Sequence, residues 1–175
     1  MERTKKDKMK KYAVYSAFLL AAVLLQNVQH AWFDIGGARC FFLIPTAILL
    51  GIDEDERTAA MIGLLSGVIW DIVSAQHMGF NAVFLMIVCY ISSSLVTYLL
   101  RATYWVGVVS CAVSSLLYVL AYWLLFVMAR GGDGAADSIW YFYIPCFVYT
   151  SVMSMLLNLA IIAAKRRINK EPCPA

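Results

Sequence analysis

The residues best suited to chemistry lie in one stretch, GLLSGVIWDIVSAQHMGFNAVF, which covers residues 63–84. Asp71 is the only acidic residue inside an apolar run of the chain. A carboxylate in such a run usually faces a bundle interior or water. Three roles are open to it: accepting hydrogen bonds from the following turn, contacting a partner protein, or transferring a proton or solute. The turn role is favoured, because Ser74, Asn81 and backbone amides can donate to Asp71 and His77 can pair with it.

A second polar patch, QNVQH, ends the first apolar run. Its candidate residues are Gln26, Asn27 and His30. Gln26 and His30 are four residues apart, so an amide and an imidazole share one face of a helix. We expect these side chains to form hydrogen bonds with other helices, with contact to a substrate or partner as the alternative.

The sequence argues against an enzyme. A serine protease needs a base that reaches a buried nucleophile, and the two histidines both lie near the outer edge. An intramembrane aspartyl enzyme needs two carboxylates sharing one site, and a zinc protease would show H-E-x-x-H. No glycine-rich phosphate loop is present. The five cysteines form no C-x-x-C pair and no metal-ligand spacing, so we expect no metal and no cofactor.

Composition identifies the solvent of these residues as lipid. The 175-residue chain is 62% hydrophobic and 14% charged, with a mean hydropathy of +0.75. A soluble domain averages about 25% charged residues. The sequence predicts an all-α, polytopic integral membrane bundle in one domain, residues 12–164. About six spans are expected, at residues 12–32, 40–52, 58–73, 80–100, 103–128 and 139–164.

Charge at the two ends predicts the topology. Residues 1–11 form a basic N-terminus and residues 165–175 a basic tail, and by the positive-inside rule both are cytoplasmic. An even number of crossings follows. Segments 40–52 and 58–73 are short, so they either cross fully or form a re-entrant pair inside the bundle. The acidic turn DEDER, residues 53–57, is expected to be solvated, with a basic cytoplasmic partner as the alternative.

One helical face in residues 58–74 carries only small or polar side chains. Gly63 and Gly67 form a G-x-x-x-G pair, and Asp71 and Ser74 continue the same face. Such a face lets two helix backbones approach closely in lipid. It is expected to pack against another helix of this chain, and the alternative is that it docks a second membrane protein.

These residues resemble the signature of the MreD family of bacterial rod shape-determining membrane proteins. That family shows G-L-x-x-G-x-x-x-D-x-x-S, a short turn, and G-x-N-A before a long apolar span. The matching positions here are Gly63, Leu64, Gly67, Asp71, Ser74, Gly79, Asn81 and Ala82. LLQNVQHAWFDIGGARC also resembles the end of the family's first span. The resemblance covers residues 24–90, and Pro45 and the polar turn SAQHMG depart from the family pattern.

The resemblance implies a non-enzymatic subunit of the cell-elongation machinery in the bacterial cytoplasmic membrane. Its partners would be an MreC-like membrane protein, an MreB-like filament and lipid, with RodA and a penicillin-binding protein contacted indirectly; nucleic acid is not expected. The alternative is the solute-binding subunit of an energy-coupling-factor vitamin transporter. In that case Asp71, His77 and Asn81 would line an outward pocket together with the QNVQH patch.

Overall fold

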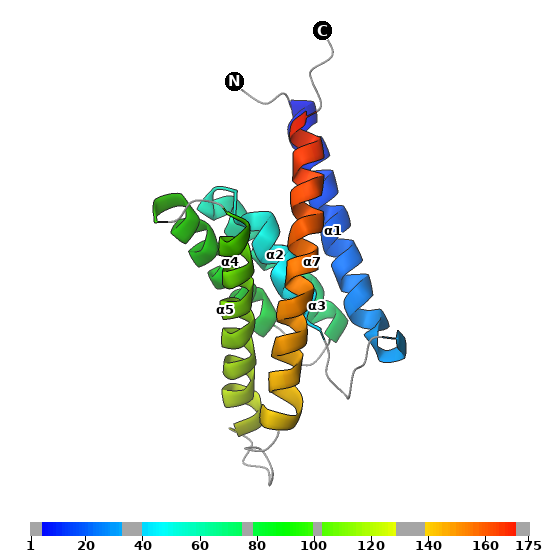
Figure 1. Cartoon of the computed structure of the whole chain (residues 1–175), viewed down its shortest axis with the longest axis vertical. Helices are drawn as coiled ribbons and strands as arrows, with labels where there is room; N and C mark the ends of the chain where they lie inside the picture. Colours follow the sequence, from blue (N-terminus) through cyan, green and yellow to red (C-terminus); the bar gives the residue numbers. More distant parts are fainter. Residues whose placement is uncertain (1–4, 33–39, 75–78, 100–102, 129–138, 171–175) are drawn as a thin grey trace.

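The described part of the chain is entirely helical. The computed structural model describes residues 5–32, 40–74, 79–99, 103–128 and 139–170 (Figure 1). The elements are α1 (Lys5–Trp32), α2 (Leu43–Gly51), α3 (Glu56–Ser74), α4 (Phe80–Tyr98), α5 (Tyr104–Tyr122), the π-helical turns η1 (Trp123–Val127) and η3 (Ile139–Tyr143), and α7 (Ile144–Lys170). The predicted all-α class is confirmed, and the helices α1 and α7 extend into the two basic segments that the sequence set apart.

Four helices of the described residues are long and apolar enough to cross a membrane. They are Glu56–Ser74, Phe80–Tyr98, Tyr104–Val127 and Ile139–Lys165. Their outward faces carry large exposed apolar side chains, such as Leu65, Val109 and Val152, as expected for contact with lipid. Among the described residues, the helices at the predicted spans 12–32 and 40–52 are not both long enough and apolar enough to count as membrane-crossing helices.

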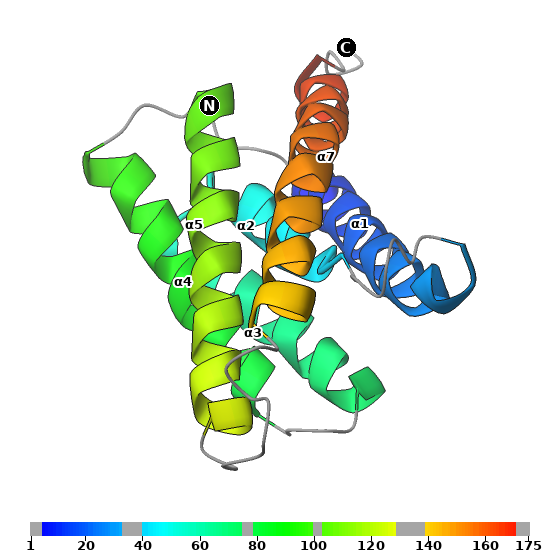
Figure 2. The same ribbon diagram turned by 60° about the horizontal axis from the view of Figure 1, so that its bottom comes forward.

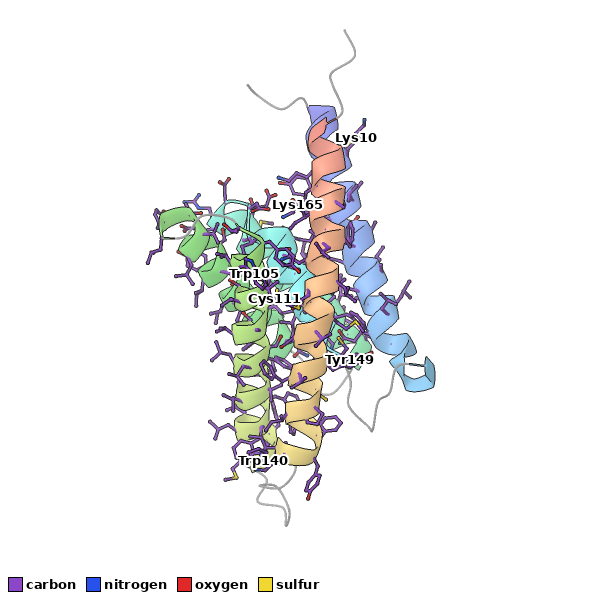
Figure 3. The ribbon with its side chains drawn as sticks, in the orientation of Figure 1. Lys10, Trp105, Cys111, Trp140, Tyr149 and Lys165 are labelled. Atoms are coloured by element: carbon purple, nitrogen blue, oxygen red, sulfur yellow. The ribbon has the colours of Figure 1, made fainter. Side chains whose placement is uncertain are left out.

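Successive α-helices alternate in direction along the bundle (Figure 1). In Figure 1 the start of α1 and the end of α7 both point toward one end of the molecule, which we call the terminal end. The turn between α2 and α3 also lies there. Figure 3 shows Lys165 toward the terminal end of α7 and Trp140 at the opposite end.

The short helix α2 lies at the centre of the bundle. All nine of its residues are buried, and it contacts α1, α3, α4, α5 and α7. At a rise of 1.5 Å per residue it is roughly 14 Å long, about half of a ~30 Å hydrocarbon core. α2 is therefore an internal helix surrounded by protein and too short to be a span of its own.

Side chains of other helices accept hydrogen bonds from backbone N–H groups at the N-terminal end of α2. The backbone N–H of Leu43 donates to Oε1 of Gln26 over 3.1 Å, and the N–H of Phe41 donates to Oγ1 of Thr150 over 3.1 Å. Pro45 stands in the first turn, where its missing N–H removes no helical hydrogen bond. A buried helix end needs such partners because no water reaches it.

Lys165 donates hydrogen bonds to backbone carbonyl groups at the C-terminal end of α2. Its Nζ donates to the carbonyl oxygens of Leu49 and Leu50, over 2.7 and 3.4 Å, and forms an ion pair of 2.7 Å with Asp53. An ammonium at a helix C-terminus interacts favourably with the helix dipole. Lys165, the first residue of the basic tail, therefore bonds to the core of the bundle.

The acidic turn is solvated only in part: Asp53 and Asp55 are exposed, as expected, whereas Glu54 bonds inside the chain. The carboxylate of Glu54 pairs with Nζ of Lys11 and accepts a 2.6 Å hydrogen bond from the hydroxyl of Tyr15. Its backbone oxygen accepts a 2.6 Å hydrogen bond from Ser93 of α4. Because charges from α1 and α7 face this turn, its first two acidic side chains find their basic partners in the same molecule.

Replacing Lys165 by Met is expected to lower the free energy of unfolding by about 2 kcal/mol, since hydrogen bonds from a charged donor are lost at a buried helix end. Thermal unfolding in detergent, followed by size-exclusion chromatography, measures the change. Arg57→Met is the matched control, because Arg57 is an exposed basic residue at the same end. Equal midpoints for the two variants would contradict the capping role of Lys165.

Candidate functional site

The small face of α3 packs directly against α4. A Cβ added at Gly63 would lie 2.8 Å from the carbonyl carbon of Leu85, and one at Gly67 would lie 2.5 Å from the carbonyl oxygen of Asn81. Real Cβ atoms essentially never come within 3.0 Å of such atoms. α4 therefore fills this face. The alternative, that the face docks a second membrane protein, is wrong for the folded chain.

Asp71 follows Gly67 by one helical turn and binds the start of α4. It is 5% exposed. Its Oδ2 accepts hydrogen bonds from the backbone N–H of Gly79 at 3.0 Å and of Ala82 at 3.1 Å. Its Oδ1 accepts from Nδ2 of Asn81 at 2.8 Å and from the Asn81 N–H at 3.3 Å. The carboxylate thus caps the N-terminus of α4 from the neighbouring helix.

The external cap is needed because the N-cap residue of α4 is Gly79, which has no side chain. Gly79 adopts φ +95°, in the left-handed region that L side chains avoid. This backbone conformation turns the first N–H groups of α4 toward α3. A negative group is favourable there because it also faces the positive end of the helix dipole.

Asn81 extends the network to a third helix. Its Oδ1 accepts a 2.9 Å hydrogen bond from the hydroxyl of Tyr118 in α5. The Tyr118 ring stacks on Trp70 with 5.2 Å between centroids and meets Phe41 edge-on at 5.3 Å. The polar chain from α3 through α4 to α5 is therefore enclosed by aromatic rings, which exclude water and lipid from it.

The structure supplies most of the donors that the sequence proposed for Asp71. Asn81 and the backbone amides donate to it, whereas Ser74 makes no hydrogen bond to it, and the Ser74 Oγ is buried with no hydrogen-bond partner among the described residues. His77 lies outside the described residues. The sequence analysis missed Tyr118, because no local pattern links it to a residue 37 positions earlier.

The second polar patch lies apart from Asp71, on α1. Gln26 caps α2, and Nδ2 of Asn27 donates to the carbonyl of Val23 over 2.9 Å. His30 belongs to α1, and its side chain is outside the described part. A cavity of about 40 Å³ brings the patch together with Ser74; it is lined by Val23, Gln26, Asn27, Leu43, Trp70, Val73 and Ser74.

The Asp71 network fixes helices in place. Both carboxylate oxygens of Asp71 accept hydrogen bonds from α4 or from Gly79, the residue before it. The Asn81 side chain, which bonds to Asp71, also accepts a hydrogen bond from the Tyr118 hydroxyl, so the network closes within the chain. In the residues that the structure describes, no three His, Cys, Asp or Glu side chains are grouped so as to hold a metal ion.

Comparison with known proteins gives no assignment for this site. No family model, no curated protein and no solved structure matches the chain. Function is therefore argued from the geometry of the site and the residue pattern.

Proposed function

We propose that the chain is a non-enzymatic integral membrane subunit of the bacterial cell-elongation machinery. In this role it helps maintain rod shape by scaffolding peptidoglycan synthesis with an MreC-like membrane protein and an MreB-like filament. RodA and its penicillin-binding partner are reached indirectly. The observation that carries the proposal is the α3–α4 hairpin, which is held together by five residues that resemble the MreD signature. Two glycines pack against α4, and three residues share hydrogen bonds: Gly63 and Gly67, and Asp71, Gly79 and Asn81.

Each of these residues has a distinct physical task in that hairpin. Gly63 and Gly67 allow the two helix backbones to touch, Asp71 caps α4, Gly79 turns the chain, and Asn81 links the hairpin to α5. A motif used in this way specifies a rigid shape and leaves none of these groups for a substrate. This supports a scaffold more than a catalyst.

In this proposal the terminal end faces the cytoplasm. Lys11 and Lys165 lie there beside the acidic turn, and the remaining basic residues of both chain ends adjoin it in sequence. The positive-inside rule places such an end on the cytoplasmic side. The Asp71 network and the α1–α3 cavity then lie toward the outer side of the cytoplasmic membrane.

The geometry supports the scaffold over the vitamin-transporter alternative. That alternative needs Asp71 and Asn81 to line a pocket, yet the two side chains bond to each other. The cavity beside Gln26 and Asn27 is about 40 Å³, whereas ligand pockets measure about 300–1,000 Å³.

Depletion of the protein in its native cell, with imaging of the cell outline during continued growth, tests the proposal. We expect rods to widen or round and then lyse, and the wild-type chain supplied from a second locus to restore the rod. Unchanged shape, with a growth defect cured by one nutrient, would contradict the scaffold and favour the solute-binding subunit.

A further inference from the structure

The end of the α5–α7 pair opposite the terminal end carries an aromatic surface. η1 and η3 lie there, and we call their residues, 123–127 and 139–143, the aromatic tip (Figure 1). Figure 2, in which this end comes forward, shows α1 standing apart from α5. Trp140 is 70% exposed and Tyr141 is 82% exposed. Two large rings therefore face the surroundings of the bundle at this end.

Other rings of the tip pack within the chain. The Phe126 ring meets Phe80 of α4 edge-on, with 5.1 Å between centroids, and lies 5.0 Å from Tyr122. Tyr122 in turn lies 6.3 Å from the ring of Tyr143, which is buried. η1 and η3 are thus joined to each other and to α4, and this packing holds the two exposed rings at a fixed place in the fold.

A third exposed ring lies at the other end of the same pair of helices. Trp105, in the first turn of α5, is 64% exposed. Figure 3 shows Trp105 and Trp140 toward opposite ends of the pair, and Lys165 beyond Trp105 toward the terminal end. Nδ2 of Asn158 donates to the carbonyl of Tyr104 over 3.0 Å, so Asn158 marks the level of Trp105 on α7. The helical stretch from Trp140 to Asn158 rises by roughly 27 Å at 1.5 Å per residue, close to the ~30 Å of a hydrocarbon core.

No charge interrupts the surface between these two levels. Residues 103–128 and 139–164 contain no Asp, Glu, Lys or Arg. Exposed side chains there include Val109, Leu117, Val148 and Val152. Tryptophan and tyrosine differ from these in carrying an N–H or O–H group on an apolar ring, and both are enriched where hydrocarbon meets headgroups. Spacing and residue type therefore indicate a full bilayer crossing with an exposed aromatic ring at each boundary.

We propose that the aromatic tip binds phospholipid in the headgroup region on the side of the bilayer opposite the terminal end. The rings of Trp140 and Tyr141 lie among the glycerol esters, and their N–H and O–H groups donate to ester or phosphate oxygens. With Trp105 in the other headgroup region, the tip fixes the depth of the bundle and keeps Lys165 outside the hydrocarbon. This proposal does not rest on the elongation role.

A protein partner explains the tip less well than lipid. A protein docked there would not require the distance between Trp140 and Trp105 to match the thickness of a bilayer, whereas a pair of headgroup anchors does require it. The tip also offers no charged side chain to a partner among its residues.

Spin-label depth in vesicles of phosphatidylethanolamine and phosphatidylglycerol tests the proposal. One cysteine at a time is introduced, as Tyr141→Cys or Val148→Cys, in a chain that also carries Cys173→Ser. The four cysteines of the described residues are buried and do not take the label. Power saturation with oxygen and with a water-soluble nickel chelate measures the depth.

We expect the label at position 141 in the headgroup region and the label at position 148, about two helical turns further along α7, in the hydrocarbon. Exposure to the nickel chelate at 141 equal to that of the free label in water, or a depth equal to that at 148, would overturn the proposal.

Replacing Trp140 and Tyr141 together by Ala is expected to let the tip sink into the hydrocarbon, because the exposed side chains that remain, such as Leu124 and Leu125, are apolar. A label at Ile144→Cys then moves deeper, and its collisions with the nickel chelate decrease. Leu124→Ala is the matched control on the same tip, and Trp140→Tyr with Tyr141→Trp keeps the wild-type depth. An unchanged depth in the double alanine variant, with a wild-type midpoint of unfolding, would show that the two rings are not anchors.

Photo-crosslinking in the native cell shows what covers the tip there. A photoreactive amino acid replaces Tyr141, and in a second chain it replaces Val148, which is 53% exposed within the apolar surface. We expect phospholipid adducts at both positions. A protein adduct at position 141 that outweighs the lipid adduct would overturn the proposal and make the tip a protein interface.

Discussion

Replacing Asp71 by Ala is expected to lower the free energy of unfolding by about 3 kcal/mol or more and to reduce the amount of folded protein in the membrane. The change removes all four hydrogen bonds that the carboxylate accepts, so that the first N–H groups of α4 and the Asn81 side chain lose their partner in a buried site. Each unsatisfied buried donor costs about 1–3 kcal/mol. The midpoint of thermal unfolding in detergent measures the loss.

Two further variants sharpen this result. Asp71→Asn keeps the shape, but its NH₂ group faces N–H donors, so it is expected to fall well below the wild type. Arg57→Ala removes an exposed charge and is expected to stay within about 0.5 kcal/mol. Wild-type stability of Asp71→Ala with loss of cell shape would move the carboxylate from the turn to a partner or solute role.

Replacing Gly67 by Ala is expected to destabilise the α3–α4 hairpin, although alanine favours a helix over glycine by about 1 kcal/mol. The new methyl group would lie 2.5 Å from the Asn81 carbonyl oxygen and 2.6 Å from the Ala82 nitrogen. Backbone atoms cannot move aside as a side chain can. Overpacking of this kind costs about 1–3 kcal/mol, and the separation of α4 also weakens the Asp71 cap.

Gly107→Ala is the matched control for Gly67→Ala. At Gly107 the nearest atoms to a new Cβ are side-chain ends of Asn158 and Leu49, both 3.1 Å away. These ends can shift, so the midpoint of unfolding should fall less than for Gly67→Ala. If the Gly67 variant were as stable as the wild type, the backbones of α3 and α4 would not be in contact.

The parts of the fold that the sequence predicted are those carried by local patterns. Apolar runs place the six helices, since the side chains facing lipid must be apolar over a whole span. The hydrogen bonds of Asp71 could also be predicted from the sequence, because its partners Gly79, Asn81 and Ala82 follow within eleven residues and lie at the start of the next helix.

The parts that the sequence did not predict depend on contacts between distant residues. The tail residue Lys165 caps a helix 115 positions earlier, and a basic tail has the same appearance whether its lysines meet lipid headgroups or carbonyl groups. Whether α2 crosses the membrane or lies inside the bundle was left open by the sequence, since a short apolar segment has the same composition in both places. The pairing of Tyr118 with Asn81 requires the packing of α5 on α4.

The capping of α2 sets an order for the biogenesis of this protein. A nine-residue helix is too short to remain in the bilayer by itself, and its two ends are satisfied by Gln26 from α1 and by Thr150 and Lys165 from α7. α7 leaves the ribosome after α1 to α5. The centre of the bundle is therefore completed only when α7 inserts, so a nascent chain interrupted before residue 165 leaves the C-terminal end of α2 without the cap that Lys165 provides.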